Sequence, residues 1–346
     1  MSLNKQLLIG YVHTQDLKTV TDEDARNLDI INIAFGHIQQ DEITWETFDV
    51  VEQMERLKGL NPTLKFLLSL GGWGAGGFSE AAATDEGRKS VAKSALKWIS
   101  EYNLDGVDLD WEYPSYTMAG IKGCREDKEN FTLLLKEIRE TLDKVNTSYM
   151  LTIAAGGGKY YLKGVEMKEV IKYLDYVQLM TYDLRGGFQV LTGHHTNLYP
   201  AELDLFDFSV EEAVDDFEAA GVPLDKIVIG VAFYSRMWKG VPDVDNGYLQ
   251  MAGTVGTYGP SYCELVKGYI NQNGFVRHWD DVAKAPYLFN GDTFISYDDA
   301  ESIHHKVAYM KEKGLAGIMY WEYCTDTTKT LTGVMRREIE QMTKEI

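Results

Sequence analysis

Cysteine is scarce in this sequence, which has only Cys124, Cys263 and Cys324 among its 346 residues. Their number is odd, their spacing is wide, and no two of them form a Cys-x-x-Cys pair. Zinc centres and the disulfide frameworks of small secreted domains use closely spaced cysteines. The sequence therefore predicts neither of these, although a single disulfide is left as an alternative. We expect no bound metal and no cofactor.

Positive charge is also in short supply, since 34 lysines and arginines stand against 53 aspartates and glutamates. The formal net charge of −19 repels phosphate backbones and anionic lipid surfaces. This charge argues against a nucleic acid, a membrane or a polyanion as the partner. A neutral substrate, such as an uncharged sugar polymer, meets no such repulsion.

Long apolar runs are missing as well, because no run approaches the roughly 20 residues needed to cross a bilayer. The chain does not open with a basic stretch followed by a long apolar one, and a strand-like run begins almost at once, at Leu7. We therefore expect a soluble chain that contains no signal peptide.

What the sequence does contain is a repeated alternation of short apolar runs with helix-like stretches. The runs are rich in Ile, Val, Leu and aromatic residues, which is typical of strands buried on both faces. The eight runs are 7–12, 30–35, 65–70, 106–111, 150–155, 176–181, 227–233 and 315–321. They predict eight parallel strands.

Helix-like stretches lie between most of these runs, and the clearest are 79–102, 126–145, 210–220 and 298–314. Apolar residues recur in them at helical spacing, and the third ends at a glycine that a proline follows two residues later. Eight strand-and-helix units in one chain of this length predict an α/β protein built as a single (β/α)8 TIM barrel.

One interval breaks this rhythm, because the chain between Phe233 and Leu315 is too long for one loop and one helix. Its first part is rich in Gly, Tyr and Trp and contains strand-like pieces. We interpret residues 237–297 as a small α+β insertion after the seventh strand. Residues 1–236 and 298–346 would then form the catalytic barrel.

The most informative segment is 105–112, with the sequence Asp-Gly-Val-Asp-Leu-Asp-Trp-Glu, on the fourth predicted strand. Alternate residues of a strand share a face, so Asp108, Asp110 and Glu112 point the same way. Neighbouring buried carboxyls raise one another's pKa and share protons. Glu112 lies nearest the carboxyl end of the strand, where barrel enzymes place their active sites. This position predicts a catalytic acid.

Two other interpretations of the acidic pattern are weaker. A solvated edge strand would not carry Val107, Leu109 and Trp111 on its other face. A calcium or magnesium site would need oxygen ligands around the ion, and carboxylates in line on one strand make a poor cage.

At this segment the sequence strongly resembles glycoside hydrolase family 18, the chitinase family, whose pattern is D-G-x-D-x-D-W-E. Further family motifs follow in order along almost the whole chain. Residues 69–72 resemble its S-x-G-G, 178–183 its strand-six ending, 233–236 its strand-seven ending, and Trp321 its strand-eight tryptophan. The predicted insertion resembles that of the family's A-type members.

The resemblance implies a retaining, substrate-assisted mechanism. Glu112 would protonate the glycosidic oxygen and later activate water, while the substrate's own acetamido oxygen attacks the anomeric carbon to give an oxazolinium ion. By the same resemblance, Asp110 bonds the acetamido N–H, Asp108 shares a proton with Asp110, Asp105 supports the network, and Tyr182 holds the acetamido oxygen.

The resemblance also implies a set of substrate-binding residues, several of them aromatic platforms on which a sugar ring can pack. The set is Tyr11, Phe35, Gly71, Gly72, Trp73, Tyr113, Gln178, Met180, Asp183, Tyr234, Arg236 and Trp321.

We therefore expect a glycoside hydrolase of the chitinase type that cleaves β-1,4-linked N-acetylglucosamine polymers. One alternative is an endo-β-N-acetylglucosaminidase that acts on glycans or peptidoglycan, and another is a non-catalytic chitin-binding lectin. The retained Glu112 argues against the lectin. We expect a monomer that is secreted, with its signal peptide absent from this chain, and a cytoplasmic protein as the alternative.

Overall fold

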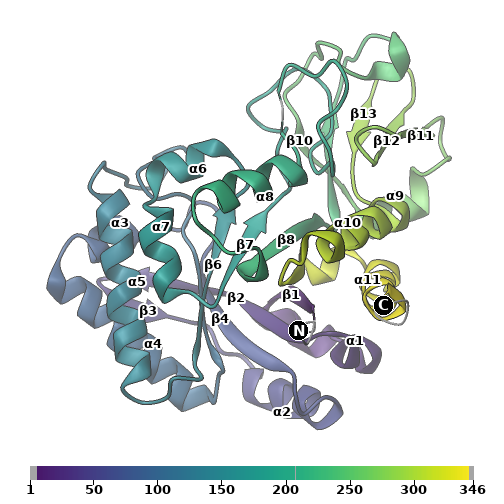
Figure 1. Cartoon of the computed structure of the whole chain (residues 1–346). Helices are drawn as coiled ribbons and strands as arrows, with labels where there is room; N and C mark the ends of the chain where they lie inside the picture. The colour runs from purple at the N-terminus through teal and green to yellow at the C-terminus, as the bar shows by residue number, and fades with distance from the viewer. Residues whose placement is uncertain (1–5, 207, 343–346) are drawn as a thin grey trace. The chain divides into compact units, whose positions relative to one another are not determined.

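The computed structural model of the protein describes residues 6–206 and 208–342, and their backbone forms two sheets (Figure 1). The larger sheet runs in the order β1-β14-β8-β7-β6-β5-β4-β2-β3, and β1 also pairs with β2. That last pairing closes eight strands into a barrel, while β3 (Glu42–Thr44) forms a hairpin with β2. The predicted (β/α)8 TIM barrel is confirmed.

The barrel strands begin where the sequence predicts them, apart from the last, and most differ by one residue at their ends. They are β1 (Leu7–His13), β2 (Ile30–Gln39), β4 (Lys65–Gly71), β5 (Gly106–Asp110), β6 (Met150–Gly156), β7 (Tyr176–Met180), β8 (Ile227–Ala232) and β14 (Gly317–Trp321). Every residue of β5, β6 and β8 is buried, as the near-continuous apolar runs predict.

Helices alternate with these strands along the chain (Figure 1). They are α1 (Asp22–Asn27), α2 (Val50–Leu60), α3 (Phe78–Ala82), α4 (Asp85–Tyr102), α5 (Asp127–Asp143), α6 (Lys159–Gly164), α7 (Met167–Val170), α8 (Val210–Ala219), α10 (Ala300–Lys313) and α11 (Thr330–Met342). None of the described helices is long and apolar enough to span a membrane.

The prediction of a single helix over 79–102 is wrong, because the segment divides into α3 and α4. Thr84, between them, has extended backbone angles, and its hydroxyl accepts a hydrogen bond from the Gly87 N–H. A threonine in this position is an N-cap that starts a new helix. The apolar spacing continues across the break, so it does not reveal the cap.

The small sheet follows β8 and confirms an inserted α+β element. It is antiparallel, in the order β10-β9-β13-β12-β11. Its elements are β9 (Tyr234–Trp238), β10 (Thr257–Ser261), α9 (Tyr262–Gly268), β11 (Val276–Asp280), β12 (Ala285–Phe289) and β13 (Phe294–Ser296). Trp238, Tyr287 and Phe294 are central to its apolar core. The predicted boundary at residue 237 falls inside β9. The boundaries 237 and 297 stay a prediction.

By its internal contacts the chain divides into two compact units. The first unit is Ile9–Leu179 with Asp216–Val228, and it holds β2, β4, β5 and β6. The second unit is the described part of Met1–Leu8, Met180–Asp215 and Ile229–Ile346, and it holds the small sheet.

A fully buried ion pair lies inside the second unit. The Lys306 ammonium donates to both carboxylate oxygens of Asp298, at 2.8 and 2.7 Å, and to the Thr196 hydroxyl at 2.7 Å. Burial lowers the pKa of Lys306, and the charge of Asp298 opposes that shift. Because Thr196 lies 3.0 Å from the Thr181 carbonyl oxygen, the pair anchors the backbone next to Tyr182.

Lys306→Met is expected to lower the free energy of unfolding by about 3–5 kcal/mol, because it leaves the Asp298 carboxylate buried without its cation. Urea unfolding measures this change. Lys267→Met, at an exposed position of α9, is the matched control and should stay within about 0.5 kcal/mol of wild type. A comparable loss in both variants would contradict the assignment of the effect to burial.

Candidate active site

Asp108 lies at the centre of a polar cluster inside the first unit. Its side chain is fully buried and accepts four hydrogen bonds. The Oδ1 atom accepts from the Thr152 hydroxyl at 2.6 Å and the Gln178 amide at 2.8 Å. The Oδ2 atom accepts from the Ser69 hydroxyl at 2.8 Å and the Tyr11 hydroxyl at 2.9 Å. Each oxygen of the carboxylate thus accepts two hydrogen bonds from other side chains.

The neighbouring carboxyl, Asp110, has a different environment. Burial raises the pKa of Asp110 well above its usual range, and the charges of Glu112 and Asp108 add to the rise. Burial also raises the pKa of Asp108, but its four hydrogen bonds oppose the shift. The Oδ1 atom of Asp110 is buried with no hydrogen-bond partner among the described residues. Asp110 is therefore the carboxyl that keeps a proton to the higher pH.

Glu112 follows the end of β5, which stops at Asp110. Its side chain is partly buried, and its charge acts on Asp110. Trp111 is buried on the helical side. Its ring stacks on that of Phe78 in α3, with the ring centroids 5.3 Å apart, and meets the ring of Phe131 in α5 edge-on, with the centroids 5.4 Å apart. The alternation expected from the sequence thus separates the carboxyls from the tryptophan.

Two glycines allow β4 to pass the backbone of Asp110. Gly71 has a φ of +118°, and a Cβ atom there would lie 2.1 Å from the Asp110 carbonyl oxygen. The Gly72 N–H donates to that same oxygen at 2.9 Å. A side chain at position 71 would therefore push β4 and β5 apart at Asp110.

The aromatic residues next to these glycines line the same region. Trp73 is half exposed, and its ring centroid lies 6.2 Å from that of Tyr113. Burial and the charge of Glu112 raise the pKa of Tyr113 well above its usual value, so its hydroxyl stays protonated. Tyr113 also packs against Tyr160 at 5.3 Å and Tyr161 at 5.9 Å. This packing fixes the chain directly after Glu112.

Asp105 does not join the other carboxyls, contrary to the role expected for it. It precedes β5, where its carboxylate accepts from the Phe66 N–H at 2.9 Å and pairs with Lys58 at 3.3 Å. It forms no hydrogen bond with Asp108 or Asp110 among the described residues. The physical reason is its position at the amino-terminal end of the strand, where it ties β4 to β5.

Two predicted residues of the second unit, Asp183 and Arg236, form an ion pair. The Arg236 guanidinium donates to the Asp183 carboxylate at 2.6 Å and lies over the Tyr258 ring at 3.8 Å. Burial alone would raise the pKa of Asp183, but contacts with His195 and Arg236 lower it to about 2. Asp183 is thus ionised at neutral pH.

The remaining predicted residues of this unit are aromatic or apolar. Tyr182 is buried, with its hydroxyl 3.8 Å from the Met319 sulfur and its ring 6.1 Å from that of Tyr234. Met180 is buried at the end of β7, and Trp321 is partly buried at the end of β14. Tyr182, Tyr234 and Asp183 therefore form one contiguous group.

Sequence reasoning missed Asn32, Thr152 and His195. Asn32 donates to the Gln178 side-chain oxygen at 2.9 Å and so orients the amide that reaches Asp108. The signal was present, because Asn32 and Thr152 are polar residues inside apolar runs. His195 gave no such signal, since it belongs to a loop. Among residues 6–206 and 208–342, no group of three His, Cys, Asp or Glu side chains could hold a metal ion.

Residues 8–326 match the family model described as "Glycosyl hydrolases family 18". Chitinase A1 of Niallia circulans is 41% identical, over 84% of this chain and 44% of that protein. Chitinase B of Serratia marcescens is 30% identical, over 90% of this chain and 75% of that protein. The chain thus spans less than half the length of the first relative.

Among solved structures, a glycoside hydrolase family 18 N-acetylglucosaminidase from Paenibacillus barengoltzii is similar over nearly the whole of both chains. The sequence identity is 54%, the TM-score is 0.94, and the match covers 96% of this chain and 99% of that one.

Proposed function

Because the chain belongs to glycosyl hydrolases family 18, we propose that it hydrolyses β-1,4-linked N-acetylglucosamine polymers, chitin or its oligosaccharides, with retention at the anomeric carbon. The resemblance predicted from the sequence is confirmed. The names of the curated relatives support chitin as the substrate class and do not favour a glycan-specific enzyme or a lectin. We also propose that it acts as a monomer outside the cell.

The observation that carries the mechanism is the difference between Asp108 and Asp110, the two carboxyls that precede Glu112 on the same face. Burial raises both pKa values, but only Asp108 has four hydrogen bonds that oppose the rise. The Glu112 proton passes to the glycosidic oxygen, and the C1–O bond breaks with its electrons going to that oxygen. The acetamido carbonyl oxygen of the substrate forms a new bond to C1, which gives the oxazolinium ion. The Glu112 carboxylate then takes a proton from water, the water oxygen bonds to C1, and the acetamido group is restored.

Asp110 supplies the acceptor that this reaction needs. Its buried Oδ1 atom lacks a hydrogen-bond partner among the described residues, so it can accept from the acetamido N–H. A negative charge there stabilises the oxazolinium cation, and such preorganised charge is often the largest catalytic term. At rest the proton that the two carboxyls share lies on Asp110. It passes to Asp108 when Asp110 accepts from the acetamido N–H, which leaves the negative charge on Asp110. The roles expected for Tyr182 and the other predicted residues of the second unit are kept as proposals.

Substrates without the N-acetyl group are expected to react at least about 10³-fold more slowly, because they lack the internal nucleophile whose proximity drives the first step. The measurement compares N-acetylglucosamine, glucosamine and glucose oligomers of equal length, and NMR reads the anomer that forms first. An α-anomer as the initial product, or rapid cleavage of the glucose oligomer, would rule out this mechanism.

A second candidate is the release of single N-acetylglucosamine residues from a chain end. The observation that favours it is the 54% identity to a protein described as an N-acetylglucosaminidase, over nearly the whole of both chains. Products from a reduced hexamer separate the two, because monomer as the only early product indicates the exo activity. A mixture of dimers, trimers and tetramers indicates a chitinase that cuts internally.

A further inference from the structure

A buried carboxylate lies at the start of α5, within the first unit and outside the cluster around Asp108. Asp127 is fully buried and accepts four hydrogen bonds. Its Oδ1 atom accepts from the Ser79 hydroxyl at 2.8 Å and the Cys124 thiol at 3.2 Å. Its Oδ2 atom accepts from the Cys124 N–H at 2.8 Å and the Ser115 N–H at 3.4 Å. The proposed mechanism makes no use of this residue.

These four hydrogen bonds do not serve the helix itself. A capping side chain accepts from backbone N–H groups in the first turn of its own helix, whereas all four donors to Asp127 precede α5. One donor belongs to α3, and the others belong to the loop 111–126, which joins β5 to α5 and contains Glu112. A buried carboxylate that loses such donors is costly. Asp127 therefore holds this loop against α3.

The loop makes a sharp turn shortly after Glu112. Ser115 has a φ of +72°, in the left-handed region that a residue with a side chain rarely adopts. Its N–H donates to Asp127, and its hydroxyl donates to the Gly164 carbonyl oxygen at 3.2 Å. Two residues separate Glu112 from Ser115, and one of them is Pro114, whose ring fixes a backbone angle. A shift of Ser115 is therefore expected to move Glu112.

The residue before Glu112 is held by the same elements. The Trp111 ring stacks on that of Phe78 in α3 and meets that of Phe131 in α5 edge-on. Ser79, which donates to the buried carboxylate, directly follows Phe78. Phe131 lies four residues after the carboxylate, on the same face of α5. Glu112 is thus flanked on both sides by residues whose supports meet at this one carboxylate.

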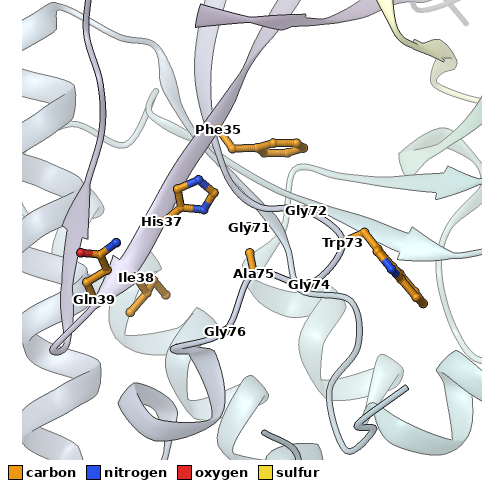
Figure 2. Close-up of a pocket in the computed structure, with 10 residues that line it drawn as sticks. All are labelled: Phe35, His37, Ile38, Gln39, Gly71, Gly72, Trp73, Gly74, Ala75 and Gly76. Atoms are coloured by element: carbon orange, nitrogen blue, oxygen red, sulfur yellow. The ribbon is translucent and has the colours of Figure 1, made fainter. Parts of the chain in front are cut away.

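The segment before α3 reaches the catalytic strand as well. The turn 72–76, which is labelled in Figure 2, leads from β4 toward α3. Its Gly72 N–H donates to the Asp110 carbonyl oxygen at 2.9 Å. The same stretch of chain therefore contacts β5 at one end and, through Ser79, the buried carboxylate at the other.

We propose that Asp127 is a positioning residue for the catalytic acid. It ties α3 to the loop 111–126 so that the Glu112 carboxyl faces the glycosidic oxygen. The proposal rests on the proposed function, which makes Glu112 the acid. Asp127 is enclosed by its four donors and acts through the backbone, so its loss should slow proton transfer without weakening the binding of the sugar polymer.

The test is a double-mutant cycle with Glu112→Gln, followed by chromophore release from an N-acetylglucosamine oligomer. Asp127→Asn keeps the size of the side chain but replaces an accepting oxygen by a donating group. In otherwise wild-type protein it is expected to lower kcat about 10–100-fold and to change KM less than about threefold, as a small displacement of a catalytic group would. In Glu112→Gln protein it is expected to lower kcat less than about twofold, because the group that it positions is already gone.

Ser79→Ala is the second variant, which carries the test if Asp127→Asn does not fold. It removes one donor and leaves the carboxylate in place. It is expected to lower kcat about 3–10-fold in otherwise wild-type protein and to have no further effect in Glu112→Gln protein.

Asp175→Asn is the matched control. Asp175 precedes β7, at the amino-terminal end of the barrel, where its carboxylate accepts from the Leu151 N–H at 2.8 Å and pairs with Arg139 at 3.5 Å. The control should lose stability in urea unfolding and keep wild-type kcat.

Equal fold losses of kcat in the wild-type and Glu112→Gln proteins would show that Asp127 acts on the fold as a whole. That result would overturn the inference while the proposed function stands, and so would a wild-type kcat in every cycle variant that folds. If Glu112→Gln alone keeps wild-type kcat, the proposed function fails and the inference fails with it.

Discussion

Glu112→Gln is expected to lower kcat at least about 10³-fold, because the variant keeps the shape of the side chain but can neither donate a proton nor take one from water. KM is expected to change only a few-fold, since the aromatic surfaces and the Asp108 cluster are untouched. The loss would therefore fall on the chemical steps and not on substrate binding.

Release of a chromophore from an N-acetylglucosamine oligomer measures both constants. Glu101→Gln, on the exposed face of α4, is the matched control and should keep wild-type kinetics. A Glu112→Gln enzyme with more than about a tenth of wild-type kcat would show that another group is the acid.

Asp110→Asn is expected to lower kcat by about 10²–10³-fold, because the neutral amide removes the charge that stabilises the oxazolinium ion. The same change is expected to stabilise the folded protein at neutral pH. Losing activity while gaining stability is a combination that damage to the fold cannot produce.

The sign of the stability change follows from the pKa. Burial and then Glu112 raise the pKa of Asp110 in the folded state, whereas the unfolded chain has a value of about 3.9. Above that pH the unfolded chain is ionised freely and the folded state is not, so the carboxyl destabilises the fold relative to asparagine. Below about pH 4 the carboxyl is protonated in both states and the advantage of asparagine disappears.

Urea unfolding at pH 7 and at pH 3 measures both limits, with Asp225→Asn at an exposed position as the control. The control should show no comparable gain at either pH. A gain for Asp110→Asn that is equal at the two pH values would contradict a raised pKa in the folded state.

Most of the fold could be predicted from the sequence, because buried parallel strands leave a strong local pattern. The runs at 106–111 and 150–155, for example, match β5 and β6 to within one residue. The division at Thr84 could not be predicted, since a cap depends on one backbone conformation while the apolar spacing runs through it. The start of β9 at Tyr234 was missed because β8 and β9 are nearly contiguous in sequence.

The common direction of the carboxyl side chains could be predicted, because a strand's period of two places Asp108 and Asp110 on one face. The partners of Asp108 depend on how strands are aligned, and the sequence does not contain that register. In the sheet Asp108 pairs with Ser69 on one side and with Thr152 on the other. The supporting role expected of Asp105 came from the resemblance alone, although its place before the strand already puts its side chain at the amino-terminal end.

The donors to Asp108 come from β1, β4, β6 and β7, so four strands converge on the carboxylate of a fifth. Replacing any of these donors by an apolar residue would make the barrel centre more hydrophobic. It would also remove one of the four hydrogen bonds that Asp108 accepts. The pKa values of Asp108 and Asp110 would then lie closer together, and the proton would be shared more evenly between the two carboxyls. Engineering for thermal robustness should therefore spare this layer, because its polarity sets where the proton rests before a sugar arrives.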